Sequence, residues 1–411
     1  MSAVAEVHGP GGRVALVLAP PAGDRRIVTG LTLGERGRRV AVKAGFPAAA
    51  VVVVRSADEL RAARAGLVGR PLLLVRATDQ VVAASLVDAL RPAELGLRHA
   101  LDPARADAYA GAWVADAEDA AGLVDALVAD FAAGDAPGAA RRGEAVPVDR
   151  RARFPVPDRA AVRAADAWQF ELVDKPLDAW LTRLFYRPLA RPMTKVFLRT
   201  PLSPNAISVL SLALSLGGCA IAAGPDRWMH VLGLAVLVLG GIVDCNDGEV
   251  ARLRLEGSKT GAWLDAIGDD MARIALILAM GSHVAYVQPD WPVWPITLAA
   301  VGMTALGLSL IYWYCIFVIH SSNNQDYTKV LGIGPGVRTG RRTAGEVLAD
   351  FGAEVIRRDF IDLGMLILAL CAVPEAGWIP LCVGSAVTLA IVVPTHLKIV
   401  RMRRDERAAA A

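Results

Sequence analysis

The stretch from Asp244 to Asp270 reads DCNDGEVARLRLEGSKTGAWLDAIGDD and lies between long apolar segments. Asp244 and Asp247 are three residues apart, and Asp265 and Asp269 are four residues apart. On helices each pair shares one face. Carboxylates within apolar segments of membrane length are costly and indicate function. Because these groups cannot neutralise one another, the pattern predicts a site for hard divalent cations such as Mg²⁺, Mn²⁺ or Ca²⁺.

The apolar content of this 411-residue chain is uneven. Hydrophobic residues make up 54% of it and the mean hydropathy is +0.41, which is high for a wholly soluble protein. Long apolar runs begin near Ala206, and the preceding part resembles a soluble domain. The net charge of +3 is too small to indicate nucleic-acid binding. The five cysteines form no CxxC pair, which argues against a zinc site or a disulfide framework.

The apolar part predicts six membrane-spanning helices. Lys and Arg gather before the first span, in the 247–260 turn, in the 319–359 loop and in the C-terminal tail, and the 283–293 turn has none. The positive-inside rule therefore predicts a protein of the cytoplasmic membrane with both termini and the 247–260 turn in the cytoplasm. No secretory signal is recognised in the first residues, which agrees with this orientation. The expected spans are about 206–224, 228–246, 261–282, 294–318, 360–376 and 378–397.

The first part of the chain predicts an α/β domain in the cytoplasm. Apolar runs at 14–19, 50–54 and 71–77 alternate with stretches of helical character, which is typical of a sheet covered by helices. The expected organisation is an α/β domain at 1–140, a linker at 141–165, an amphipathic juxtamembrane region at 166–204, a membrane domain at 205–400 and a basic tail at 401–411.

The juxtamembrane region carries aromatic rings beside cationic side chains, among them Arg191 and Lys195. Such a helix suits the level of the lipid headgroups. The alternative is an ordinary amphipathic helix packed on the soluble domain. A membrane span follows directly, which favours the first interpretation.

From Asp244 to Asp269 the residues fit D-x2-D-G-x2-A-R-x8-G-x3-D-x3-D at every position. This is the signature of the CDP-alcohol phosphotransferase family, which the chain therefore resembles. The resemblance implies transfer of a phospho-alcohol group from a CDP-alcohol to an acceptor hydroxyl, with release of CMP. It also implies two divalent ions, Mg²⁺ or Mn²⁺, bound by Asp244, Asp247 and Asp265. Asp269 is expected to be the catalytic base and a further metal ligand.

The signature also supplies candidates for nucleotide binding. Gly248 and Ala251 are small enough for a phosphate chain to approach the backbone, and Arg252 is a charge-assisted donor. Gly261, Asp244 and Asn205 complete this set. Asn205 follows Pro204 and is alternatively part of a plain helix start. Asp270 lies outside the signature, and only a supporting role is expected for it.

Four basic residues are candidates for binding the acceptor. The segment Arg357-Arg358-Asp359-Phe360 is similar to an RRDF element in family members that carry an N-terminal nucleotidyltransferase-like domain. Its arginines either hold a phosphate of the acceptor or serve as positive-inside anchors. Arg191 and Lys195 of the juxtamembrane region are the other two candidates.

The soluble domain resembles the sugar-phosphate nucleotidyltransferase fold found in bifunctional di-inositol-phosphate-phosphate synthases. The first strand, VALVLA, is followed by a Gly-containing loop at 19–26. Pro20 and Pro21 remove backbone donors where a phosphate would bind, and no equivalent of the family's Lys is evident. Asp79 is a candidate remnant of a metal-binding carboxylate. The expectation is a degenerate, non-catalytic domain.

Two donors fit the predicted transferase, a CDP-inositol-like compound and CDP-diacylglycerol. The acceptor is an alcohol or an inositol phosphate, the lipid bilayer surrounds the membrane domain, and the family resemblance implies a homodimer. The alternative function is a membrane cation transporter or channel that uses the acidic cluster. Transport predicts inverted repeats or broken helices, and neither is visible in the sequence.

The predicted orientation is testable by cysteine labelling in a Cys-free background. A Lys259→Cys variant is expected to resist an impermeant thiol reagent in intact cells, because the 247–260 turn faces the cytoplasm. An Asp290→Cys variant on the opposite turn is the matched control and should react. Labelling of the first variant and protection of the second would invert the topology.

Overall fold

The structure is a computed structural model in two compact units, each described here by itself. The first comprises Met1–Asp174 with Arg252–Leu255, and the second comprises Lys175–Ala251 with Glu256–Ala411. The described residues are 12–19, 26–27, 29–67, 70–77, 80–90, 96–102, 109–132, 143–156, 158–173, 180–321, 327 and 357–410.

The first unit contains a six-stranded mixed sheet with the order β2-β1-β3-β6-β5-β7, and a two-stranded sheet of β4 and β8. In the large sheet β1, β2 and β3 are parallel to one another, β6 runs antiparallel to β3 and β5, and β7 is parallel to β5. The strands are β1 (Val14–Leu18), β2 (Val51–Val54), β3 (Leu72–Arg76), β4 (Gln80–Val82), β5 (Arg98–Leu101), β6 (Tyr109–Ala115), β7 (Glu144–Pro147) and β8 (Arg153–Pro155).

The strand predictions at 14–19, 50–54 and 71–77 are confirmed as β1, β2 and β3. Every residue of β1 is buried, as expected of a central strand with helices on both faces. The expected loop of Pro20 and Pro21 and the carboxylate Asp79 lie outside the described residues.

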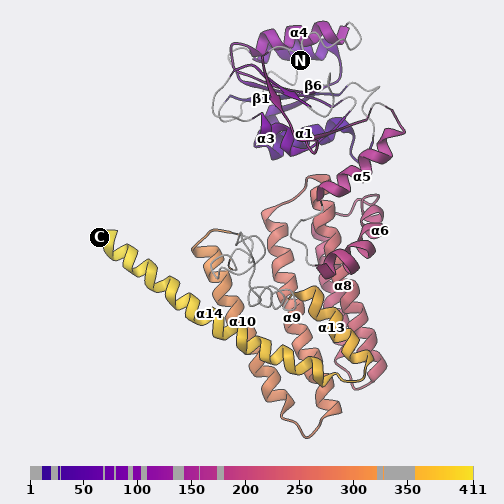
Figure 1. The fold of residues 1–411 in the computed structure, drawn as a ribbon, viewed down its shortest axis with the longest axis vertical. Helices are drawn as coiled ribbons and strands as arrows, with labels where there is room; N and C mark the ends of the chain where they lie inside the picture. Colours follow the sequence, from indigo (N-terminus) through magenta and orange to yellow (C-terminus); the bar gives the residue numbers. More distant parts are fainter. Residues whose placement is uncertain are drawn as a thin grey trace, which may run out of the picture. The chain divides into compact units, whose positions relative to one another are not determined.

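Helices cover both faces of the large sheet, and each face has its own hydrophobic core. On one face lie α1 (Leu33–Lys43) and α3 (Ala84–Ala89), and on the other α2 (Ala57–Arg64) and α4 (Ala120–Ala132). Figure 1 shows α1 and α3 on one side of the sheet and α4 on the other. The Thr32 hydroxyl caps α1 by accepting from the backbone N–H of Glu35. The first unit is therefore a three-layer α/β domain.

Residues 141–165, where the sequence predicts a linker, contain β7, β8 and the start of α5 (Ala161–Val173). β7 completes the large sheet beside β5, and β8 pairs with β4. Both strands are short and lie among Pro, Gly and charged residues, so their sequence resembles a connecting segment. These elements belong to the first unit.

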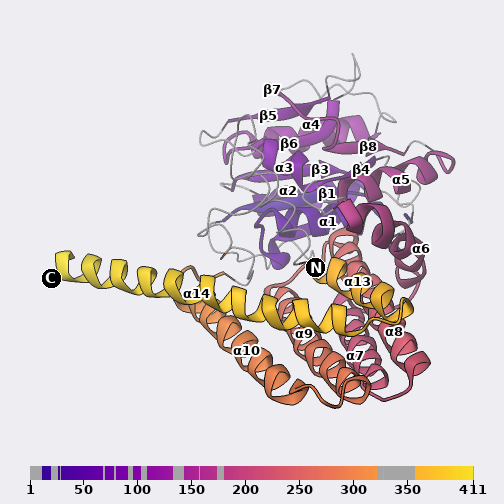
Figure 2. The ribbon, with the colours of Figure 1, turned by 60° about the horizontal axis from the view of Figure 1, so that its bottom comes forward.

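The second unit is helical, and five of its helices are long and apolar enough to cross a membrane. Large apolar side chains such as Leu239, Leu298 and Ile367 are exposed, which suits hydrocarbon surroundings. The helices are α6 (Arg187–Phe197), α7 (Pro204–Ala222), α8 (Arg227–Arg254), α9 (Lys259–Val287), α10 (Val293–Phe317), α13 (Arg358–Leu370) and α14 (Glu375–Ala410), with a π-helical turn at Thr182–Tyr186. Figure 2 shows the neighbouring helices of this unit.

The prediction of six spans is not confirmed, because α13 takes the place of the span expected at 360–376. It has 13 residues, about 20 Å of helix, against a hydrocarbon core of about 30 Å. The helix ends at Leu370, and Ala372 beyond it has a left-handed φ of 61°. Among the described helices, those that satisfy both length and composition are α7, α8, α9, α10 and the Glu375–Arg401 part of α14.

The acidic stretch of the sequence folds into the facing ends of α8 and α9. α8 ends at Arg254 and α9 begins at Lys259, so four residues separate them. Ser258 starts α9 as its N-cap by accepting from the backbone N–H of Gly261 at 3.0 Å. So short a connection makes the two helices antiparallel neighbours.

Glycines allow the backbones of α7 and α8 to touch. A Cβ atom at Gly218 would lie 2.6 Å from the Gly233 carbonyl oxygen and 2.7 Å from the Leu237 nitrogen. A Cβ at Gly233 would lie 2.3 Å from the Ala222 nitrogen. Small residues at helix contacts in membranes permit this close packing.

A Gly218→Ala variant is therefore expected to lose about 1–3 kcal/mol of stability, because its methyl group meets backbone that cannot move aside. The measurement is the thermal midpoint of the purified protein in detergent. Gly217→Ala is the matched control on the same helix, since a Cβ there meets nothing within 4 Å. Equal midpoints for the two variants would contradict the close contact.

Candidate active site

Three aspartates of the acidic stretch converge between α8 and α9. Asp244 and Asp247 of α8 and Asp265 of α9 each offer a carboxylate oxygen, and these oxygens lie within 4.8 Å of one another. Asp247 is buried, Asp244 is half-buried and Asp265 is exposed. A cluster of carboxylate oxygens suits Mg²⁺, Mn²⁺ or Ca²⁺ rather than zinc.

One face of α7 supports this cluster through three buried serines. The Ser208 hydroxyl donates to Asp247, and the Ser211 hydroxyl donates to Asp244 Oδ1 at 3.0 Å. Ser215 Oγ accepts from Arg358 Nη2 at 2.7 Å. Spacings of three and four residues place the serines on one helical face. These serines are not among the predicted site residues, although a row of serines along an apolar helix is the pattern that indicates a polar face.

The fourth aspartate of the signature is paired with a cation. Asp269 forms an ion pair with Arg358, the second arginine of the RRDF element. The same guanidinium lies 3.9 Å from Asp244 and 3.4 Å from Asp362. Arg358 therefore lies among three carboxylates, and Asp362 behind it is buried.

The start of α13 is attached to the π-helical turn that precedes α6. The Thr182 hydroxyl donates to the Asp359 carboxylate, and the Tyr186 hydroxyl donates to the Asp359 carbonyl oxygen at 2.8 Å. Arg357 Nε lies 3.6 Å from Asp359 Oδ1. These contacts fix the first turn of α13 and hence the position of Arg358.

Two of the predicted nucleotide-binding residues are neighbours. A Cβ atom at Gly261 would lie 2.9 Å from Asn205 Oδ1, so the start of α7 and the first turn of α9 meet there. Gly248 and Ala251 follow Asp247 on α8 and are half-buried. α8 is continuous to Arg254, so Arg252 lies five residues, about 7.5 Å along the helix axis, beyond Asp247.

Asp270 has its own partner. It is buried, and its carboxylate accepts a hydrogen bond from the Tyr312 hydroxyl of α10. The Tyr312 ring packs against Trp263 at 5.6 Å. This contact connects α9 with α10 and agrees with a supporting role.

The family comparison matches the part of the chain that holds this cluster. Residues 201–329 match the family described as CDP-alcohol phosphatidyltransferase. The chain is therefore similar to this family over about a third of its length. All four signature aspartates, together with Asn205 and the α7 serines, lie inside the matched range.

Two curated relatives resemble parts of the chain, and both are named bifunctional IPC transferase and DIPP synthase. The protein of Rubrobacter xylanophilus is 44% identical over 162 residues, which are 38% of this chain and 34% of the relative. That of Aquifex aeolicus is 31% identical over 99 residues, 24% of this chain and 22% of the relative. The match thus spans about a third of the first relative and less than a quarter of the second.

A solved structure also aligns with half of the chain. It is the Mycobacterium tuberculosis phosphatidylinositol phosphate synthase with CDP-DAG bound. The alignment covers 51% of this chain and 94% of that chain, at 20% identity and a TM-score of 0.32.

The acceptor candidates occupy two regions of the second unit. Arg357 and Arg358 lie at the start of α13, and Arg358 forms ion pairs with Asp244 and Asp269 of the signature. Arg191 and Lys195 lie four residues apart on α6. The contact between Arg358 and Asp269 joins residues 89 positions apart, so local spacing alone does not reveal it.

A buried polar network joins α6 to the signature segment of α8. Glu249 is fully buried, and Arg187 Nη1 donates to its Oε1 at 2.5 Å. The Thr194 hydroxyl lies 2.5 Å from Glu249 Oε2 and 2.7 Å from Asn246 Oδ1. Glu249 occupies a variable position of the signature beside Gly248, so the network holds this part of α8 against α6.

An Arg187→Met variant is expected to lose roughly 3–5 kcal/mol of stability, because it leaves the Glu249 carboxylate buried without its cation. The double variant Arg187→Met/Glu249→Leu should recover most of that loss, since neither charge remains. Thermal midpoints in detergent provide the comparison. A double variant as unstable as the sum of its single variants would contradict the buried pair.

Proposed function

We propose that this protein transfers a phospho-alcohol group from a CDP-alcohol to an acceptor hydroxyl and releases CMP. The observation that carries the proposal is the cluster of Asp244, Asp247 and Asp265 inside the matched CDP-alcohol phosphatidyltransferase domain. The names of both curated relatives are those of transferases or synthases and support the reaction class.

The cluster fits divalent metal. Its donors are carboxylate oxygens within 4.8 Å of one another, and two of the three carboxylates accept hydrogen bonds from α7 serines that fix their orientation. Asp244, Asp247 and Asp265 would hold Mg²⁺ or Mn²⁺, which would neutralise the negative charge that develops on the pyrophosphate as CMP leaves.

The remaining residues of the proposed site act on the substrates directly. The acceptor oxygen forms a bond to the phosphorus that bears the donor's alcohol, and the bond from that phosphorus to the CMP oxygen breaks. Asp269 accepts the proton of the acceptor hydroxyl, and CMP leaves with the bond electrons. Gly248, Ala251 and Gly261 leave room for the nucleotide, and Arg252 and Asn205 supply donors to it.

Arg358 has two tasks in this proposal. It neutralises Asp269 before substrate binds, and it offers its guanidinium to a phosphate of the acceptor when that group enters. Arg357, Arg191 and Lys195 are proposed as further cations for the acceptor.

We propose an inositol phosphate as acceptor and a CDP-inositol-like compound as donor, with CDP-diacylglycerol as the second donor to test. The RRDF element, the appended α/β unit and the names of the curated relatives support this choice. A phosphorylated acceptor also suits Arg358, which lies beside the proposed base.

The proposed setting is the cytoplasmic membrane, with both termini and the site on the cytoplasmic side and α13 completing a bundle of six helices. A homodimer through the membrane domain is the proposed assembly, and cross-linking of the purified protein tests it.

The first unit is proposed to make no CDP-alcohol. The check is the absence of pyrophosphate when the full chain receives CTP, Mg²⁺ and inositol phosphate.

An Asp269→Asn variant is expected to lower turnover about 10²–10⁴-fold, because it lacks the proton acceptor. The assay measures CMP release by purified protein with Mg²⁺, each candidate CDP-alcohol and each candidate acceptor. Asp290→Asn, an exposed carboxylate on the opposite turn, is the matched control and should retain activity. Excess EDTA should abolish the activity of the wild type and of the Asp290→Asn variant. Near-normal turnover of Asp269→Asn would reject the base, and full activity in EDTA would reject the metal.

A further inference from the structure

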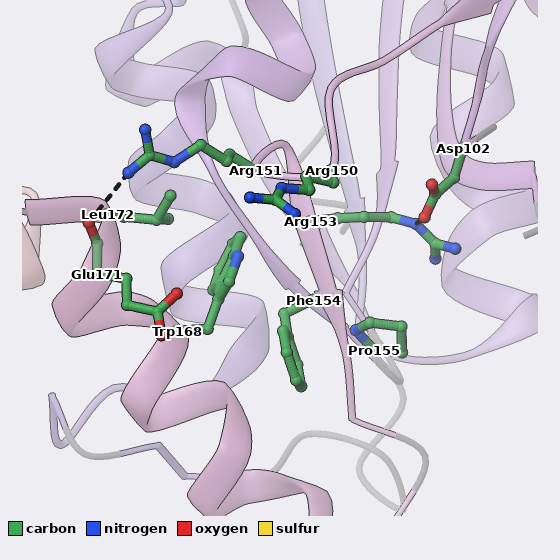
Figure 3. A pocket seen from close by; sticks show the side chains of 9 residues that line it. All are labelled: Asp102, Arg150, Arg151, Arg153, Phe154, Pro155, Trp168, Glu171 and Leu172. Atoms are coloured by element: carbon green, nitrogen blue, oxygen red, sulfur yellow. Dashed lines mark hydrogen bonds and ion pairs between the residues drawn. The ribbon is translucent and has the colours of Figure 1, made fainter. Parts of the chain in front are cut away.

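A cavity of about 450 Å³ lies in the first unit, lined by residues of that unit alone (Figure 3). Three arginines line it, Arg150, Arg151 and Arg153, together with the rings of Phe154 and Trp168. Its volume falls within the range of small-molecule sites, roughly 300–1,000 Å³. None of the lining residues belongs to the proposed transfer site.

The arginines are presented by a fixed turn between β7 and β8. Asp149 Oδ1 accepts from the backbone N–H of Arg151 at 2.7 Å, and the Asp149 carbonyl accepts from the Ala152 N–H at 2.8 Å. Arg151 Nη2 donates to the Glu171 carbonyl oxygen of α5 at 3.1 Å, the contact drawn in Figure 3. The turn therefore holds its cations at the cavity mouth.

The Arg153 side chain is a fixed part of the cavity wall. It is buried, its Nε donates to Asp102 Oδ2 at 3.0 Å, and its Nη1 donates to Gln80 Oε1 at 2.8 Å. Figure 3 shows its guanidinium turned towards Asp102. Because Asp102 neutralises this cation, the charge open to a ligand comes from Arg150 and Arg151. Arg150 is exposed and has no ion pair or hydrogen bond with other described residues.

An aromatic surface lies beside these cations. The Phe154 and Trp168 rings pack at 5.6 Å with a tilt of 44°. Such a surface favours a flat ring, and exposed arginines favour phosphate. Glu171 also lines the cavity, and its carboxylate is an acceptor for sugar hydroxyls.

Part of the cavity lies three strands away from β1 in the large sheet. β5 is parallel to β1 and lies three places away in the sheet, about 14 Å at the usual strand spacing. Asp102 follows β5, and the Arg150–Arg151 turn follows β7, so both lie at the carboxyl edge of that half of the sheet.

We propose that this cavity binds a nucleoside monophosphate. Arg150 and Arg151 bind the phosphate, the Trp168 and Phe154 surface receives the base, and Glu171 accepts from the ribose hydroxyls. Three arginines and two carboxylates, Asp102 and Glu171, line the cavity, so its lining carries one net positive charge. This small excess favours a single phosphate group over a triphosphate.

The test is equilibrium binding of labelled CMP to the full chain in detergent with excess EDTA, which removes the metal-dependent site from the measurement. CMP is expected to bind, and the double variant Arg150→Gln/Arg151→Gln should weaken binding at least tenfold. Arg13→Gln is the matched control, because Arg13 is an exposed arginine before β1 at the opposite edge of the sheet. AMP should compete with CMP, since the surface has no base-specific contact, and inorganic phosphate should compete far less.

Three outcomes would overturn the assignment: no CMP binding in EDTA, equal binding by the double variant and the wild type, or competition by phosphate as strong as by AMP. An Asp244→Ala variant separates this site from the proposed reaction. It should release no CMP from any CDP-alcohol and still bind CMP in EDTA. Loss of EDTA-resistant binding in that variant would place the nucleotide in the membrane unit instead.

Discussion

Repulsion among the clustered carboxylates is the constraint on which the second unit depends. Asp244, Asp247 and Asp265 place negative oxygens within 4.8 Å of one another in two largely apolar helices. Such charges destabilise the fold unless donors or cations surround them. The protein supplies hydroxyl donors from α7 and a guanidinium from α13, and the proposed metals supply the remaining charge.

This requirement explains where polar side chains occur in the apolar helices. Ser208, Ser211 and Ser215 face the cluster instead of lipid, and Asp362 lies behind Arg358. A second buried pair, Arg187 with Glu249, holds the signature segment of α8 from its other side. The carboxylates therefore have supports from three directions, which is what a metal site needs for fixed geometry.

Some features of the fold and of the aspartate cluster are predictable from the sequence, and others are not. The spacing of the aspartates within one short segment predicts the cluster, and continuous apolar runs predict β1, β2 and β3. Those features are local, so one sequence suffices to predict them. β7 and β8 have no such pattern, because they are short and take their stability from pairing with β5 and β4. The partnership of Arg358 with Asp269 and the serine face of α7 arise only when distant helices pack. Hydropathy also predicts a span that continues to residue 376. In the structure α13 ends at Leu370, and the backbone at Ala372 is in a left-handed conformation.

The direct contact between Gly218 and Gly233 has a mechanical consequence. Because the two backbones meet without intervening side chains, α7 cannot slide along α8 without a steric clash. The serines of α7 and the first two aspartates of α8 thus behave as one rigid body. A bulky donor must therefore be admitted without movement of α7 along α8. Ser208 and Ser211 then keep their register with Asp247 and Asp244.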